Sequence, residues 1–182
     1  MVDKKQDLAV RILPYESKAP EIFKGIRRFI YDVIPYKIEV EHIGSTAVPG
    51  LGGKGIIDIL IVTQHQYQLP EIAEILRNKG FNHNPEPRHA EDRFFVSGPY
   101  RYKGEELHIH IHITFSGSKE HKDKLLFRDY LRQHIEEART YFELKKRWSI
   151  EAGSDPSKYT ELKTPYINRI LKKARREEEG WR

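Results

Sequence analysis

The sequence predicts a single α+β domain, with a small mixed sheet flanked by helices and a helical C-terminal half. Three observations support this fold class. A helical pattern precedes two strand-like segments, two further strand-like segments flank a turn region, and everything after about residue 118 follows a helical pattern. The 182 residues suffice for one domain with a full core, and no repeat or low-complexity linker divides them.

The N-terminal half is predicted to contain a helix, two strands and a short second helix. Apolar residues recur at helical spacing over 20–33. Residues 37–43 alternate between apolar and polar side chains, which is typical of a strand. Residues 55–62 form a nearly continuous apolar run, which predicts a strand buried on both faces. Residues 69–79 predict the second helix, with Gly80 at its end.

A hairpin is predicted in the middle of the chain. A polar loop at 82–92 precedes two strand-like segments, RFFVSG and ELHIHIHITF. These segments flank Gly98, Pro99 and Gly104, a pattern that indicates a hairpin with a longer loop.

The rest of the chain is predicted to be helical. One apolar stripe is formed by Phe127, Leu131, Ile135, Ala138 and Phe142. Gly153 ends this region, and a last helix begins at Asp155 and Pro156, a typical N-cap and first-position pair. Pro165 is expected to kink this helix or to restart it.

Composition narrows the classes of function. The net charge of +5 favours anionic partners such as nucleotides, other phosphate-bearing small molecules or nucleic acid, although no motif supports nucleic acid. No apolar run approaches the ~20 residues of a membrane helix, and the first residues lack the apolar core of a signal peptide. The absence of cysteine excludes thiolate metal ligands. We therefore expect a cytoplasmic protein that does not enter a membrane.

The most informative stretch is EHIGSTAVPGLGGKGIIDILIV, in which a strand, a Gly-Ser turn and a second strand follow one another. Gly44 and Ser45 can present backbone N–H groups and a hydroxyl to a phosphate, and Thr46 can help to cap the turn. Lys54 in the connecting loop can neutralise a phosphate. Asp58 can hold the divalent cation that accompanies such a phosphate. The stretch therefore predicts nucleotide-type phosphate chemistry.

Each of these residues also has a plainer interpretation. Asp58 is the only charged residue on its face of an apolar strand, and a lysine or histidine alone would satisfy it. The Gly-Ser turn would then be an ordinary turn, and Lys54 an exposed loop lysine.

Three histidines alternate with isoleucine in the last predicted strand. His108, His110 and His112 share one face, at spacings of roughly 7 Å between neighbours. Imidazole suits zinc, manganese or nickel better than magnesium, and it can also act as a general base. His110 and His112 are predicted to join Asp58 as metal ligands. The alternative is a solvated sheet face on which the histidines have no special role.

Basic residues on the predicted helices are a weaker signal. Arg128 lies at four-residue spacing from Lys124 and Arg132 and could clamp a phosphate. Nearby aspartates could pair with this stripe, which favours a solvated face. The same interpretation is given to Tyr141, Lys145 and Lys163.

The whole pattern resembles the GrpB family, a group of small bacterial and archaeal proteins. The stretch from Glu41 to Val62 carries the resemblance most specifically, and matches continue through HIH at 110–112, FRDYLR at 127–132, YFELKKR at 141–147 and YTELK at 159–163. The resemblance spans about residues 12–172, so the expected organisation is one domain over residues 1–182.

The GrpB family in turn resembles the DNA polymerase beta-like nucleotidyltransferase superfamily. That resemblance implies a minimal mixed sheet with flanking helices, a Gly-Ser turn that grips phosphates, and acids that hold two magnesium ions. Gly44 and Ser45 correspond to the turn and Asp58 to the first acid. Leu60 stands where the second acid is expected, and His110 or His112 where the third is expected.

Three functions follow as hypotheses. The first is a divergent, metal-assisted nucleotidyltransferase that acts on a nucleoside triphosphate and an unknown acceptor. Gly44, Ser45, Thr46 and Lys54 would bind the nucleotide, a Mg or Mn ion would sit on Asp58, His110 and His112, and Arg128 would balance charge in the transition state. The second is an inactive nucleotide- or coenzyme-binding module of the same fold, since domains of this family are sometimes joined to dephospho-CoA kinase. The third is a hydrolase using Zn or Ni.

Overall fold

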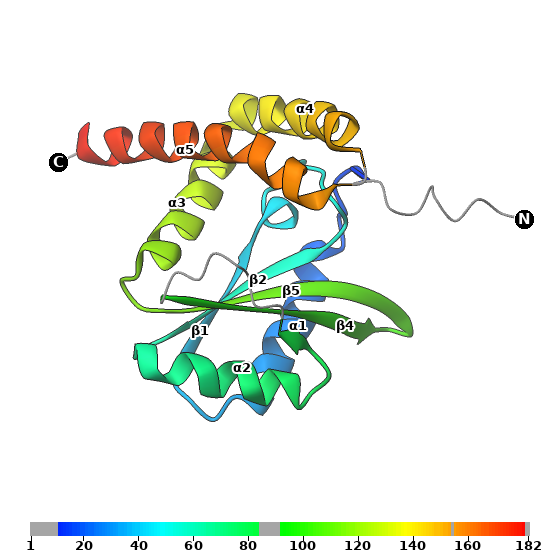
Figure 1. The fold of residues 1–182 in the computed structure, drawn as a ribbon, viewed down its shortest axis with the longest axis vertical. Helices are drawn as coiled ribbons and strands as arrows, with labels where there is room; N and C mark the ends of the chain where they lie inside the picture. The colour runs from blue at the N-terminus through cyan, green and yellow to red at the C-terminus, as the bar shows by residue number, and fades with distance from the viewer. Residues whose placement is uncertain (1–10, 84–91, 154, 181–182) are drawn as a thin grey trace, which may run out of the picture.

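The computed structural model describes residues 11–83, 92–153 and 155–180. Its helices and strands are α1 (Ala19–Val33), β1 (Ile38–Ile43), β2 (Ile57–Thr63), α2 (Leu69–Arg77), β3 (Asn82–His83), β4 (Arg93–Tyr102), β5 (Glu105–Phe115), α3 (Lys119–Gln133), α4 (Ile135–Ala152) and α5 (Pro156–Gly180), with short 3-10 turns at η2 (Ser45–Ala47) and η3 (Gln66–Gln68). Helices α1 and α2 pack on one face of the sheet, and α3 packs on the opposite face (Figure 1). The α+β class with a helical C-terminal half is confirmed.

The sheet is mixed, as predicted. Its strand order is β1-β2-β5-β4-β3, with β2 and β5 parallel and the other pairs antiparallel. The parallel pair sets Asp58 directly opposite His110. Because side chains alternate along a strand, both of these residues face the side of the sheet that α3 covers.

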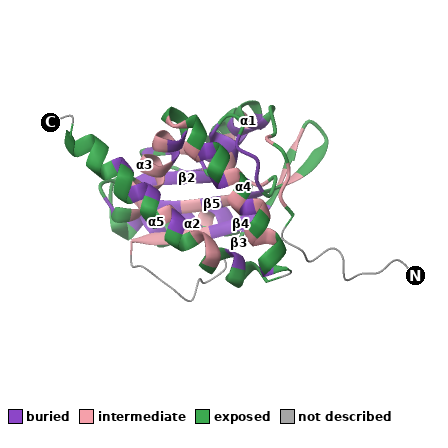
Figure 2. Cartoon of the chain, turned by 90° about the horizontal axis from the view of Figure 1, so that it is seen from above, coloured by how far each residue is buried: buried purple, intermediate pink, exposed green. Residues whose placement is uncertain are grey.

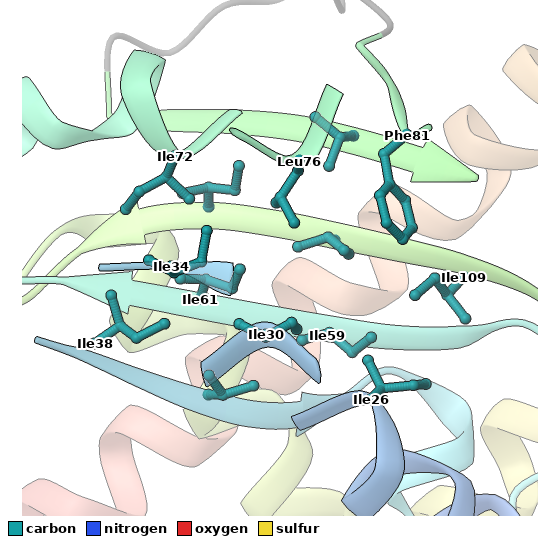
Figure 3. Packing of buried hydrophobic residues seen from close by; sticks show 14 of the residues in the cluster. Ile26, Ile30, Ile34, Ile38, Ile59, Ile61, Ile72, Leu76, Phe81 and Ile109 are labelled. Carbon is teal, nitrogen blue, oxygen red and sulfur yellow. The ribbon is translucent and has the colours of Figure 1, made fainter. Parts of the chain in front are cut away.

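The main core lies between the sheet and helices α1 and α2. Ile59 and Ile61 of β2, and Ile109 of β5, are fully buried there against Ile26 and other apolar residues of the two helices (Figure 3). Leu60 is also fully buried, on the opposite face. The prediction of a second strand buried on both faces is therefore confirmed. Figure 2 shows the buried residues gathered along the strands, with exposed residues on the outer sides of the helices.

A second apolar cluster attaches the C-terminal helices to the loop that follows the Gly-Ser turn. Val48 and Leu51 of that loop pack with Leu131 of α3, Tyr141 of α4 and Ile170 of α5, among others. Figure 1 shows α4 and α5 side by side across the end of the sheet at which β1 leads into the turn. The helical half therefore closes over that turn.

The middle hairpin differs from the prediction. Strand β4 continues through Gly98 and Pro99, and the loop is only the pair Lys103–Gly104. Both residues have positive φ, 47° and 88°, as two-residue hairpin turns of the type I′ kind require. The predicted polar loop before the hairpin lies mostly at 84–91, outside the described residues.

The C-terminal helices also differ from the prediction. The apolar stripe does not lie on one helix, because His134 adopts φ −118° and ψ 78° and separates α3 from α4. Ile135 of the stripe is consequently 50% exposed. Helix α5 continues through Pro165 without restarting, and Asp155 caps it by accepting from the backbone N–H of Ser157 at 2.9 Å. None of the helices in the described ranges is long and apolar enough to cross a membrane.

Candidate functional site

The Gly-Ser turn is built against Asp58. Gly44 has a positive φ of 71°, and a Cβ at this position would lie 2.3 Å from Asp58 Oδ2. Glycine is therefore required both by the backbone conformation and by the space. Gly53 leaves space for the side chain of Ser45, because a Cβ on Gly53 would lie 2.1 Å from the Ser45 hydroxyl oxygen. The turn thus brings the hydroxyl and the carboxylate to one place.

Asp58 pairs with one of the three histidines. Its Oδ1 lies 3.2 Å from Nδ1 of His110, and the Asp58 side chain is 24% exposed. This pairing fits both interpretations of Asp58, the acid satisfied by a histidine and the functional acid. The expectation that the glycine turn, the acid and an imidazole lie close together is met.

These groups line a small pocket of about 140 Å³. The turn and sheet contribute Ser45, Gly53, Lys54, Ile56, Asp58 and His110, and the C-terminal helices contribute Tyr141, Lys145, Tyr159 and Lys163. The helical residues are the part that the sequence interpretation missed, since Tyr141, Lys145 and Lys163 were assigned to a solvated face. That assignment is wrong, because α4 and α5 fold over the turn and direct these side chains into the pocket.

A repeated five-residue motif positions the helical residues. The segments YFELK in α4 and YTELK in α5 both place a tyrosine four residues before a lysine, which puts the two side chains on one helix face. Lys145 Nζ lies 4.9 Å from the centre of the Tyr141 ring. Lys54 and Lys163 each place Nζ 4.8 Å from the centre of the Tyr159 ring. The repetition is the sequence signal that could have revealed the site.

The lysines are held in surroundings that disfavour their charge. Burial lowers the pKa of Lys145 to about 7, and repulsion by Lys163 adds to the effect while Asp58 opposes it. Burial also lowers the pKa of Lys163 to about 8, with a contribution from Lys54. Lys145 is only 4% exposed, and its Nζ donates to the Gly52 carbonyl. An anion in the pocket would relieve this accumulation of positive charge.

Three predicted site residues lie away from this pocket. Thr46 faces the other side of the turn, where its hydroxyl lies 2.9 Å from Nε2 of His42. Arg128 is 9% exposed and bonds Asp129 and Glu41 as well as the His42 carbonyl, so it fastens α3 to the end of β1.

His112, the third of these residues, is two positions along β5 from His110. Its Nδ1 lies 3.7 Å from Glu120 Oε1 of α3, and burial lowers its pKa well below the usual value. His112 therefore does not join Asp58 and His110, and its imidazole is held neutral.

The side chains around Asp58 do not fit a divalent metal site. Within the described ranges, no group of three or more His, Asp or Glu residues is arranged to hold a metal ion. Leu60, at the position expected for a second acid, is fully buried with Ile43 and Val62. The other charged side chains that line the pocket are lysine ammoniums, which repel a cation. One carboxylate and one imidazole make a poor site for magnesium, which prefers several oxygen ligands.

Solved structures show what this fold resembles. GrpB from Enterococcus faecalis superposes with a TM-score of 0.76 at 26% identity, covering 94% of this chain and all of that one. Cid1 poly(U) polymerase bound to MgGTP superposes with a TM-score of 0.51 at 18% identity, covering 75% of this chain and 44% of that one. The second likeness shows a nucleotidyltransferase-like fold.

Sequence comparisons agree with the structural ones. A UPF0157 protein of Pseudomonas aeruginosa is 32% identical over 92% of this chain and 69% of its own length. A dephospho-CoA kinase of Mycobacterium leprae is 26% identical over 80% of this chain, which matches 42% of that protein. The sequence model of the GrpB protein family matches residues 9–173. This chain therefore belongs to the GrpB family.

Proposed function

We propose that this protein binds a nucleotide through its phosphate chain, in the pocket formed by the Gly-Ser turn and the C-terminal helices. The observation that supports this most directly is the convergence of Ser45, Lys54, Lys145 and Lys163 on one small cavity. A hydroxyl and three ammoniums are donors that recognise phosphate oxygens. The nucleotidyltransferase-like fold gives the same ligand class by analogy.

The reaction we propose is transfer of the nucleotidyl group to an acceptor hydroxyl. The acceptor oxygen would form a bond to the α-phosphorus, and the bond from that phosphorus to the pyrophosphate oxygen would break. The paired Asp58 and His110 would take the proton that the acceptor hydroxyl loses. The lysines would stabilise the negative charge on the departing pyrophosphate.

A second candidate is a binding module that retains the ligand and lacks the reaction. Leu60 favours it, because this buried apolar side chain stands where the resemblance implies a metal-binding acid. The similarity to part of a dephospho-CoA kinase makes a coenzyme A-type nucleotide a specific ligand to test. The hydrolase using Zn or Ni is not proposed, because His112 lies with Glu120 instead of with Asp58.

Titration calorimetry and a transfer assay test both candidates. The four nucleoside triphosphates and dephospho-coenzyme A would be titrated into the protein, and labelled nucleoside triphosphates would be incubated with it and an acceptor pool. Ser45→Ala should weaken binding, whereas Ser149→Ala, on the part of α4 away from the pocket, should not. Binding with transfer supports the first candidate, and binding without transfer supports the second. Absence of binding by every nucleotide would refute the proposal.

A further inference from the structure

Positive charge predominates among the residues that line the pocket. Lys54, Lys145 and Lys163 supply three ammoniums, whereas Asp58 supplies the only carboxylate among the lining residues. That carboxylate already pairs with His110. Side chains that cluster positive charge in a low-dielectric cavity attract an anion and exclude a cation.

None of the three lysines forms an ion pair with a carboxylate of any described residue. Elsewhere on the same helices, lysines do find such partners, as Lys146 does with Glu143 and Lys173 with Glu137. Lys145 is buried and Lys163 is partly buried, whereas Lys54 at the mouth of the pocket is exposed. A buried cation with too few opposite charges around it is costly. Asp58 attracts all three ammoniums, but it is one carboxylate against three cations and it already pairs with His110. This shortfall of negative charge points to an anionic ligand.

The tyrosines fix the ammoniums in place. Tyr159 contacts both Lys54 and Lys163, whose Nζ atoms each lie 4.8 Å from its ring centre, and the Nζ of Lys145 lies 4.9 Å from the ring centre of Tyr141. An aromatic face attracts a cation and partly offsets its lost hydration. The cations are therefore arranged before any ligand arrives, which lowers the entropic cost of binding.

The volume of the pocket limits what part of a ligand can enter. The pocket has a volume of about 140 Å³. Sites that enclose a whole drug-sized ligand usually measure ~300–1,000 Å³. The pocket therefore suits one or two phosphate groups, and a nucleoside would lie outside it.

We infer that the three lysines replace the divalent ions on which this fold usually relies, so that the pocket binds the diphosphate or triphosphate part of a nucleotide without a metal. This inference rests on the proposed nucleotide binding and adds the mode of recognition. It predicts that affinity depends on the number of phosphates and on the lysines, and that it does not depend on magnesium or manganese.

Calorimetry in EDTA compared with Mg²⁺ or Mn²⁺ tests the inference. ATP, ADP, AMP and pyrophosphate would each be titrated into the full chain. We expect ATP and ADP to bind in EDTA, AMP to bind at least tenfold more weakly, and added metal to change the ATP affinity by less than about threefold. Lys163→Met and Lys54→Met should each weaken ATP binding by about tenfold to a hundredfold, because each removes a charge-assisted hydrogen bond.

The control is Lys172→Met, which removes an exposed lysine from the same helix as Lys163. Circular dichroism would confirm that each variant is folded. ATP binding that requires Mg²⁺ or Mn²⁺ would overturn the inference and leave the proposed function standing. So would affinities of the Lys54 and Lys163 variants that equal that of the control.

The remaining outcomes separate the two proposals. Pyrophosphate binding in EDTA without binding of any nucleotide would support the lysine cluster as a polyphosphate site and refute nucleotide binding. Absence of binding by all four compounds, with and without metal, would refute the inference. If the other nucleoside triphosphates and dephospho-coenzyme A also failed to bind, the proposed function would be refuted with it.

Discussion

Replacing Lys145 with methionine should make the protein more stable and remove its ligand binding. Lysine and methionine are both unbranched, so methionine can occupy the same buried path without the charge. This opposite effect on stability and on ligand binding is expected of a residue that lowers the stability of the fold but contacts the ligand. The sign and the pH dependence of the stability change follow from the pKa of Lys145.

Burial lowers the pKa of Lys145 from 10.5 to about 7. The unfolded chain therefore binds more protons than the folded one between about pH 7 and pH 10.5, and native stability rises with pH through this window. Relative to an uncharged side chain, Lys145 costs about 4 kcal/mol at pH 7 and about 2 kcal/mol at pH 9. The lost bond to the Gly52 carbonyl offsets about 1–3 kcal/mol of the gain at either pH.

Lys145→Met should thus raise the free energy of unfolding by about 1–3 kcal/mol at pH 7 and change it little at pH 9. The difference between the two pH values, about 2 kcal/mol, does not depend on the hydrogen-bond correction. Urea unfolding followed by circular dichroism at both pH values measures it. Lys172→Met, at an exposed position, serves as the control with no such difference. An equal effect of Lys145→Met at both pH values would refute the reasoning.

Three other perturbations have expected outcomes. ATP affinity should fall as the pH rises from 7 to 9, because Lys145 and Lys163, with pKa values of about 7 and 8, lose the protons that attract phosphate; calorimetry at three pH values measures this. The titratable groups around these ammoniums are Tyr141, Tyr159, Lys54, Asp58 and His110 of the pocket and Lys124 of α3. Gly44→Ala should lower the midpoint of thermal unfolding more than Gly50→Ala does. Both glycines have positive φ, but a Cβ at Gly44 would collide with Asp58, whereas nothing lies within 4 Å of a Cβ at Gly50. Arg128→Met should cost about 1–3 kcal/mol in urea unfolding, mainly by leaving the buried His42 carbonyl unpaired, and an unchanged free energy of unfolding would contradict its anchoring role.

The sequence predicts well those features that depend on neighbouring residues in the chain. Periodicity identifies α1, β1 and β2, and the expected sheet brings Asp58 beside His110. The hairpin turn is misplaced because Gly98 and Pro99 resemble loop residues, although β4 accommodates both within the strand.

The site residues that were missed depend on long-range packing. Lys145 and Lys163 resemble ordinary surface lysines, and their burial follows only from the way α4 and α5 close over the turn. Arg128 was expected at the site because it belongs to a basic stripe, but the packing of α3 against β1 directs it to Glu41. The periodicity of one helix does not show which of its faces will be covered by an element that is distant in the sequence.

The order in which the pocket residues occur along the chain has a consequence for biosynthesis. Ser45, Asp58 and His110 leave the ribosome well before Lys145, and the YTELK segment emerges last of all. A nascent chain that stops before Tyr159 would thus possess the acid and the turn, but only one of the two helical ammoniums. Ligand capture would then require the first turns of α5, and a premature stop before Tyr159 would remove Tyr159 and Lys163 while leaving the residues of all five strands in the chain.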